Sequence, residues 1–349
     1  MRPDLKVIEG PYLGDILHQP QALEDTLATL SSSKELESLA SRLNKGRFQR
    51  VVLTGMGSSF HALHPLNLQL ISHGHTAFMV ETSELVHYKS RLFEPKTLII
   101  AVSQSGQSAE MVRLATANRK RSAVIAVTNT PESALAKHAT VAVVTRAGGE
   151  YSVSCKTYVT ALMALKWLGD VLCLRDGKRT RQELRPAAPA VAAYLADWKD
   201  YVHSLTEKLR DIRHLFFVGR GASLAAVGTG ALIVKEADLF HAEGMSSAAF
   251  RHGPFEMLSS EAFVAVFSGD TKTRDLNRRL LADMQERGGF AELIGEKGSL
   301  ECFRLADHGD SVRPILEILP VQMITLALAA LEGREPGKFE HATKITVTE

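Results

Sequence analysis

A turn rich in hydroxyl groups lies between an apolar run and a helix-like stretch in the first third of the chain. Residues 98–102 are typical of a strand covered on both faces, and residues 109–115 have the periodicity of a helix. The turn, residues 103–108, contains three serines and two glutamines. A phosphate docked at such a helix start would gain hydrogen bonds from unpaired N–H groups and from hydroxyls. The serines could equally be ordinary helix caps, so the pattern alone leaves phosphate binding and capping open.

Two side chains suited to proton transfer occur later. Glu236 belongs to a charged run, residues 235–243, which we expect within an otherwise apolar helix, and His252 precedes a Gly-Pro turn. A positioned carboxylate and a histidine can serve as base and acid. On the residues alone, however, a surface glutamate and a histidine bonded within its own turn are the favoured interpretation. Residues 342–349 are β-branched and partly apolar, so we expect them to pack onto the body and to bring Lys344 inward.

Strand-like runs alternate with helix-like sequence through the first half. Four apolar runs are expected to form strands: residues 51–55, 76–80, 98–102 and 123–127. This rhythm predicts an α/β fold with a doubly wound parallel sheet. Ligands of such sheets bind beyond the carboxyl ends of the strands, where the serine turn and a glycine-serine turn at residues 55–59 fall.

The same order of elements recurs in the second half. The expected strand 215–218 leads to a glycine turn and a helix from Leu224, and the expected strand 263–267 leads to a polar turn. An internal duplication is the simplest explanation. The second polar turn carries Asp270, whose carboxylate would repel a phosphate, so we expect a single phosphate cradle, in the first half.

These patterns predict a division of the chain into five parts. A polar, proline-bearing segment, residues 176–186, interrupts the hydrophobic pattern and is interpreted as a connector. The expected parts are a helical arm (1–44), a first α/β domain with the phosphate cradle (45–175), a connector with a helix (176–200), a second α/β domain (201–340) and a C-terminal tail that packs onto the body (341–349).

Composition excludes several classes of protein. The 349 residues are 45% hydrophobic and 23% charged with a net charge of +2, which is typical of a globular chain and gives no basic footprint for nucleic acid. The most apolar helix candidate, residues 158–174, is interrupted by Lys166 and Asp170, so we expect a core helix and no membrane span. Three scattered cysteines and the absence of a signal-like N-terminus favour a reducing, cytoplasmic location.

No cofactor or metal is expected. The turn at residues 55–59 begins like a dinucleotide fingerprint, and Glu81 could receive a ribose hydroxyl, but Phe60 stands where the third glycine belongs. The chain contains no G-x-x-x-x-G-K-[ST] run for a nucleoside triphosphate. Histidines and carboxylates do not cluster with the spacing of metal ligands.

Four motifs in order make the chain resemble the sugar isomerase (SIS) family, and more narrowly the isomerase half of glucosamine-6-phosphate synthase and its stand-alone relatives. The resemblance covers residues 45–349. The motifs are the turns at 103–108 and 55–59, the run from Lys235 to Pro254 and the terminal residues 344–349. The resemblance implies two tandem SIS domains, each a doubly wound, mainly parallel sheet flanked by helices.

The resemblance also implies roles for particular residues. A 6-phosphosugar would be held at its phosphate by the matching serines and glutamine: Ser59, Ser103, Gln104, Ser105 and Ser108. Glu236 matches the carboxylate that moves a proton between C1 and C2. His252 matches the histidine that assists ring opening and reaches the site of the neighbouring subunit, which implies a homodimer with a shared active site. Lys344 matches a tail lysine that contacts the sugar carbonyl or helps to open the ring. Weaker candidates for substrate contacts are Gly57, Ser58 and Ser154.

The chain departs from the synthase pattern in two respects. It begins Met1-Arg2, without a cysteine nucleophile or room for a glutaminase domain, and Ala249 stands where the synthase has a glutamate. We therefore expect an isomerase and deaminase that converts glucosamine 6-phosphate to fructose 6-phosphate and ammonia, or the reverse. The alternative is a deglycase that cleaves a 6-phosphorylated fructosamine, and a non-catalytic sugar-phosphate binder or regulator also stays open.

Overall fold

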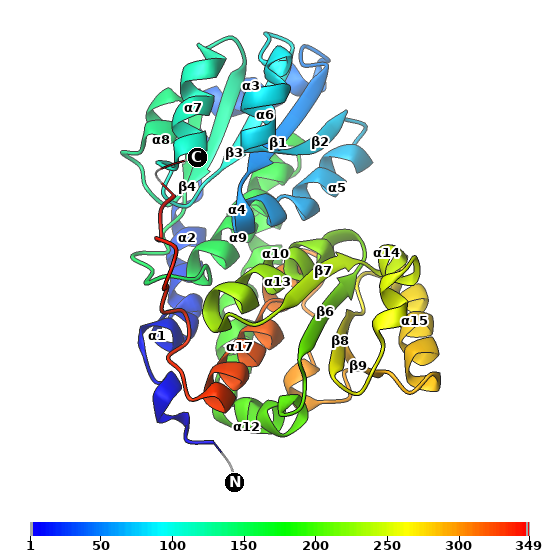
Figure 1. Ribbon diagram of the computed structural model, residues 1–349. Coiled ribbons are helices and arrows are strands. Elements are labelled where there is room, and N and C mark those ends of the chain that lie inside the picture. The colour runs from blue at the N-terminus through cyan, green and yellow to red at the C-terminus, as the bar shows by residue number, and fades with distance from the viewer. Residues whose placement is uncertain (1–2, 347, 349) are drawn as a thin grey trace. The chain divides into compact units, whose positions relative to one another are not determined.

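The computed structural model describes residues 3–346 and 348, and these form two compact units (Figure 1). Met1, Arg2, Val347 and Glu349, which belong to the expected arm and tail, lie outside the described residues. The first-sheet unit comprises Gln21–Glu150, Lys156–Pro186 and the tail from Ala342 onward. The second-sheet unit comprises the chain up to Pro20, Tyr151–Cys155 and Ala187–His341.

The first-sheet unit is built on five parallel strands in the order β2-β1-β3-β4-β5. The strands are β1 (Arg50–Gly55), β2 (Ala77–Glu81), β3 (Thr97–Val102), β4 (Ala123–Thr128) and β5 (Val141–Val144). Its helices are α2 (Gln19–Thr29), α3 (Lys34–Asn44), α4 (Gly57–His61), α5 (His64–Ser72), α6 (Thr82–Tyr88), η2 (Ser90–Leu92), α7 (Ala109–Asn118), α8 (Ala134–His138), α9 (Lys156–Leu172) and α10 (Gly177–Leu184).

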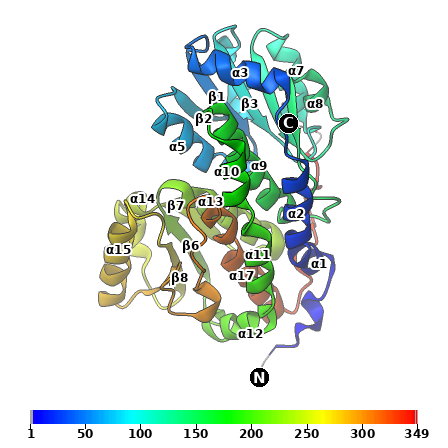
Figure 2. The same cartoon turned by 180° about the vertical axis from the view of Figure 1, so that it is seen from behind.

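Helices cover both faces of this sheet. On one face α6, α7 and α8 pack against alternate strand residues such as Val52, Ile99 and Ala126 (Figure 1). On the other face lies α9, with α3, α5 and α10 packed against it (Figure 2). Every residue of β3 is buried, which explains why the sequence of this strand is a continuous apolar run.

The second-sheet unit repeats the design with four parallel strands in the order β7-β6-β8-β9. The strands are β6 (His214–Gly219), β7 (Ala242–Ser246), β8 (Ala262–Phe267) and β9 (Phe290–Ile294). Its helices are η1 (Leu5–Ile8), α1 (Pro11–Leu17), α11 (Ala187–Leu195), α12 (Trp198–Leu209), η3 (Gly221–Ser223), α13 (Leu224–Asp238), α14 (Ser247–Arg251), η4 (Pro254–Met257), α15 (Arg274–Glu286), η5 (Glu301–Phe303), α16 (Arg313–Leu316) and α17 (Leu319–Glu332).

The two sheets share one strand order, because the first strand of each lies between the second and the third. The predicted α/β fold with two mainly parallel sheets is confirmed. The expected core helix at residues 158–174 is also confirmed, since most of α9 is buried.

The charged run at 235–243 does not form one helix, so that prediction was wrong. Helix α13 ends at Asp238, Leu239 adopts a left-handed conformation with φ of 53°, and β7 begins at Ala242. Pairing of Ala242 with Leu215 of β6 sets this edge strand, although its own sequence has low strand propensity.

The polar segment interpreted as a connector contains helix α10. Asp176 caps that helix by accepting a hydrogen bond from the Lys178 N–H group at 3.0 Å. The buried carboxylate of Asp170 on α9 accepts a hydrogen bond from the hydroxyl of Thr180 at 2.8 Å. The segment is therefore folded against α9.

One helical stretch among the described residues, Arg313–Glu332, is long and apolar enough to cross a membrane. Inside the protein, 94% of its most apolar window is buried. A core helix meets the same criteria, so this stretch is weak evidence for a membrane span.

Candidate functional site

The serine turn, residues 103–108, joins β3 to α7 in the first-sheet unit. The Ser103 Oγ atom accepts a hydrogen bond from the Gly106 N–H group at 3.1 Å, and the Ser105 Oγ atom accepts one from the Gln107 N–H group at 3.2 Å. Each of these hydroxyls shapes the turn and keeps its own hydrogen for donation. Ser108 occupies the N-cap position of α7, but its side chain forms no capping hydrogen bond. Helix capping therefore does not explain Ser108.

Backbone contacts fix the orientation of this turn. The Gln104 carbonyl accepts a hydrogen bond from the Asn129 N–H group at 3.1 Å, and the Gly106 carbonyl accepts one from the Leu135 N–H group at 3.0 Å. Gly106 has φ of +60°, and a Cβ atom there would lie 2.3 Å from the Ser133 Oγ atom, so only glycine fits without strain. These bonds hold carbonyl oxygens, which would repel an anion, against the segment that follows β4.

The glycine-serine turn lies at the same end of the sheet. A Cβ atom on Gly55, the last residue of β1, would approach the Val102 carbonyl oxygen at the end of β3 to 3.1 Å. Glycine thus lets this turn come close to the strand that carries the serine turn. Helix α4 begins at Gly57, which has φ of +52°, with Ser58 buried and Ser59 half-buried in its first turn.

The tail contributes a cation to the first-sheet unit. The Lys344 Nζ atom lies 2.6 Å from the Glu150 Oε2 atom, and the side chains are 24% and 0% exposed. Glu150 also accepts hydrogen bonds from the N–H group of Thr157 at 3.0 Å and from its hydroxyl at 2.7 Å. Lys344 therefore lies inward, as its β-branched neighbours predicted, and a buried carboxylate holds it.

The tail backbone also reaches the serine turn. The Thr346 carbonyl accepts a hydrogen bond from the Ala109 N–H group, the first of α7, at 3.1 Å. One of the unpaired N–H groups at this helix start is thereby occupied. The structure thus brings the tail and the serine turn together.

Glu150 is a residue that sequence reasoning missed. It follows the pair Gly148-Gly149, which marks a turn, and no local pattern distinguishes its carboxylate from a surface glutamate. Its neighbour Lys156 is also buried, and the Lys156 Nζ atom donates a hydrogen bond to the Gly149 carbonyl at 2.5 Å. A lysine at the start of a strongly apolar helix is a signal that could have drawn attention to this segment.

Glu236 belongs to the second-sheet unit, in the last turn of α13, where it is half-buried. Asp238, two residues on, is buried, and burial raises the pKa of its carboxyl well above the ordinary range, with Arg334 opposing the shift. The pKa of the buried Tyr12 hydroxyl is raised mainly by burial, with smaller contributions from Cys155, Asp238 and Glu236. Burial therefore disfavours the charged forms of both the Asp238 carboxyl and the Tyr12 hydroxyl near Glu236.

Two further candidates lie on other elements of the second-sheet unit. His252 is exposed at the end of α14, and Gly253 follows it with φ of 136°. Ser154 is half-buried in the segment Tyr151–Cys155. Within the first-sheet unit, the structure places the serine turn beside the tail and beside the glycine-serine turn.

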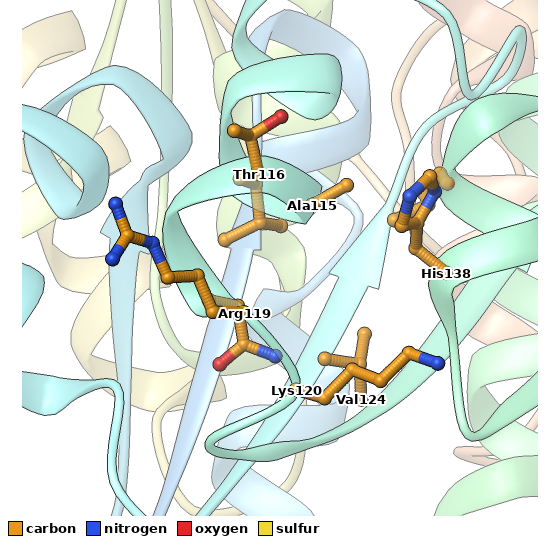
Figure 3. Close-up of a pocket in the computed structure, with 9 residues that line it drawn as sticks. Ala115, Thr116, Arg119, Lys120, Val124 and His138 are labelled. Carbon is orange, nitrogen blue, oxygen red and sulfur yellow. The ribbon is translucent and has the colours of Figure 1, made fainter.

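A pocket of about 400 Å³ lies at the opposite end of α7 from the serine turn. Its lining combines apolar Leu114, Val124 and Leu135 with the basic side chains of Arg119 and Lys120. Figure 3 shows Lys120 and His138 on the side of the pocket away from Arg119. Because Val124 is at the amino end of β4, this pocket is separate from the candidate site. Within residues 3–346 and 348, no three His, Cys, Asp or Glu side chains are grouped to hold a metal ion.

Comparisons with known proteins agree with the duplicated fold. The SIS domain model matches residues 47–169 and 208–308, which is more than half of the chain. The chain is 29% identical over 347 residues to a glutamine–fructose-6-phosphate aminotransferase (isomerizing) of Pyrococcus horikoshii. That match covers 97% of this chain and 57% of the relative, so the chain spans little more than half of its relative's length.

Solved structures share the fold at lower identity. The C-terminal domain of glucosamine-fructose-6-phosphate aminotransferase from Francisella tularensis superposes with a TM-score of 0.83 at 22% identity, covering 94% of this chain and 98% of that one. Glucosamine-6-phosphate deaminase from Thermotoga maritima superposes with a TM-score of 0.77 at 20% identity, covering 97% and 100%.

Proposed function

The chain belongs to the SIS domain family, and on that premise we propose that it is an enzyme that isomerises and deaminates an amino sugar 6-phosphate. The serine turn is the observation that carries this proposal. The Ser103 and Ser105 hydroxyls retain hydrogens to donate, the turn's own carbonyls are bonded to the segment after β4, and the turn leads into the ten-residue helix α7. These are the features that a dianionic phosphate requires.

The proposed reaction converts glucosamine 6-phosphate and water to fructose 6-phosphate and ammonia. After ring opening, Glu236 takes the C2 proton to give an enolamine and returns it to C1, which leaves an imine at C2. Water adds to that imine and ammonia leaves, so atoms balance without an oxidant or a cofactor. Binding energy from the phosphate, which does not react, would orient C1 and C2 toward the base.

His252 and Lys344 are proposed to assist ring opening. The exposure of His252 supports a role in the site of a neighbouring subunit, and we infer a homodimer with shared sites on this basis. The ion pair with Glu150 supports a role for Lys344, because it fixes an otherwise flexible cation in the tail.

A deglycase that releases an amine larger than ammonia is the second candidate. It would use the same proton transfer, and it is supported by Ala249, a small exposed residue where the synthase pattern has a glutamate. Both enzymes would act on a small phosphorylated sugar.

A substrate panel tests these proposals. We would supply glucosamine 6-phosphate, fructose 6-phosphate with ammonium, and 6-phosphofructosyl amino acids, each beside its unphosphorylated form, and measure ammonia, amine and ketose. Ammonia release from glucosamine 6-phosphate alone supports the deaminase, and amine release from the fructosyl compounds supports the deglycase. Turnover of none of the phosphorylated compounds, or equal turnover of the unphosphorylated ones, would contradict the proposal.

A further inference from the structure

The second-sheet unit contains a small cavity at the position that corresponds to the serine turn. It lies beyond the carboxyl ends of β8 and β9, is about 20 Å³ in volume, and is lined by Ser268, Gly295 and Glu317 among others. Ser268 directly follows β8, as Ser103 directly follows β3. A cavity of this size holds one group as large as a water molecule.

Glu317, which lies between α16 and α17, points a buried carboxylate into this cavity. The residue is 2% exposed. Its Oε1 atom accepts a hydrogen bond from the Ser223 hydroxyl at 2.7 Å, whereas its Oε2 atom is buried and has no hydrogen-bond partner among the described residues. Ser223 lies in the glycine turn after β6, the counterpart of the turn that carries Ser59. The turn that we propose to bind an anion in the first copy therefore corresponds, in the second copy, to a turn that faces a carboxylate.

The groups around Glu317 carry excess negative charge. Two pairs are balanced: Arg313 with Asp310 at 2.5 Å, and Arg274 with Glu296 at 3.0 Å. The remaining acids are Asp270, whose Oδ1 atom accepts hydrogen bonds from backbone N–H groups, and Asp307, which caps the Gly309 N–H group. His308 also lines the cavity.

Burial raises the pKa of Glu317 to about 7. Asp270 and Asp310 add to this rise, and Ser223 and Arg313 oppose it. A proton therefore partly neutralises the carboxylate at neutral pH. A bound cation would replace that proton and would satisfy the unpaired oxygen.

We propose that this cavity binds a small monovalent cation, held by the Glu317 Oε2 atom and the Ser268 hydroxyl oxygen. The duplication has in this view produced two sites of opposite charge preference, one for an anion and one for a cation. Ammonium and potassium ions share the required size and charge. The cavity would exclude larger cations such as choline. This inference does not depend on the proposed catalytic function.

Thermal unfolding of the full chain in matched chloride salts tests the proposal. At constant ionic strength near pH 7.5, ammonium or potassium chloride should raise the unfolding midpoint saturably relative to choline chloride. A rise with ammonium alone would indicate recognition by hydrogen bonds, and a rise with both would indicate recognition by charge and size. Equal midpoints in all three salts would overturn the proposal.

Substitutions test whether the salt dependence of the unfolding midpoint arises at this cavity. Glu317→Gln keeps an oxygen for Ser223 but removes the charge, and should abolish the difference between salts. The matched control Glu296→Gln removes a carboxylate that also lines the cavity but is already paired with Arg274, and should preserve the difference. Ser268→Ala should weaken the apparent affinity for ammonium or potassium several-fold. This variant tests the site if the Glu317 variant does not fold. An undiminished salt difference in the Glu317 and Ser268 variants would refute the assignment.

Discussion

The ion pair between Glu150 and Lys344 should control whether the tail stays docked. Glu150→Gln preserves the size of the side chain and one oxygen for Thr157, but removes the charge that faces the Lys344 ammonium group at 2.6 Å. A hydrogen bond between charged groups contributes about 1.5–3 kcal/mol. Because the Lys344 side chain is 24% exposed, solvent screening favours the lower end of that range. We therefore expect the tail to dock roughly 10-fold more weakly, since about 1.4 kcal/mol corresponds to a factor of ten.

Two measurements check this expectation. Carboxypeptidase digestion of the tail should accelerate in Glu150→Gln, and turnover of the substrate identified by the panel should fall in parallel. Glu132→Gln is the matched control, because it removes a carboxylate from an exposed pair with Lys137 at 3.5 Å and should change neither quantity. If digestion and turnover in Glu150→Gln both equal those of the unaltered protein, Glu150 does not position the tail and the reasoning fails.

Three other predictions concern single residues, two in the second-sheet unit and one in the first-sheet unit. Glu236→Gln should reduce turnover of a 6-phosphosugar by several orders of magnitude while product binding survives, as measured by steady-state kinetics and calorimetry; a near-normal rate would exclude the carboxylate as the base. Ser105→Ala should weaken binding of the phosphorylated sugar by roughly 10-fold, from the loss of about 1–2 kcal/mol in hydrogen bonding, and leave the affinity for the unphosphorylated sugar unchanged. Asp238→Asn should stabilise the protein increasingly as pH rises above about 4. Because the pKa of this carboxyl is higher in the folded state than in the unfolded state, wild-type stability falls as pH rises. Urea titrations at pH 4 and pH 7 measure the difference in unfolding free energy between Asp238→Asn and the wild type, and an equal difference at both pH values would argue against the raised pKa.

The strands that could be predicted from the sequence are those whose own residues favour a buried strand. Residues 98–102 and 263–267 are continuous apolar runs, and both lie in central strands, β3 and β8. The edge strand β7 was missed because its sequence, Ala-Glu-Gly-Met-Ser, contains no β-branched residue and is set by pairing with β6. Strands β5 and β9 also lie at sheet edges and were not predicted, although the sequence of β5, Val-Ala-Val-Val, itself favours a strand. The recurring order of strands and turns indicated the duplication, and the resemblance to the SIS family identified the two copies as tandem SIS domains; this prediction is confirmed.

Some residues of the candidate site could likewise be predicted from the sequence, and others could not. The serine turn could be predicted because hydroxyl residues, a glycine with positive φ and a helix start are all contiguous in the chain. Glu150 could not, because its partner Lys344 is 194 positions away and only the fold joins them. Glu317 was hidden for a related reason: its surroundings come from turns after three different strands.

The tail is attached at two points that lie two residues apart. Lys344 is held by Glu150, before α9, and the Thr346 carbonyl is held by the Ala109 N–H group, at the start of α7. The two attachments can open separately. The Ala109 amide hydrogen can exchange with solvent only when its own bond to the Thr346 carbonyl opens, which requires this part of the tail to lift. The Ala109 amide is therefore an internal reporter of tail opening, which NMR can follow residue by residue with and without a sugar phosphate.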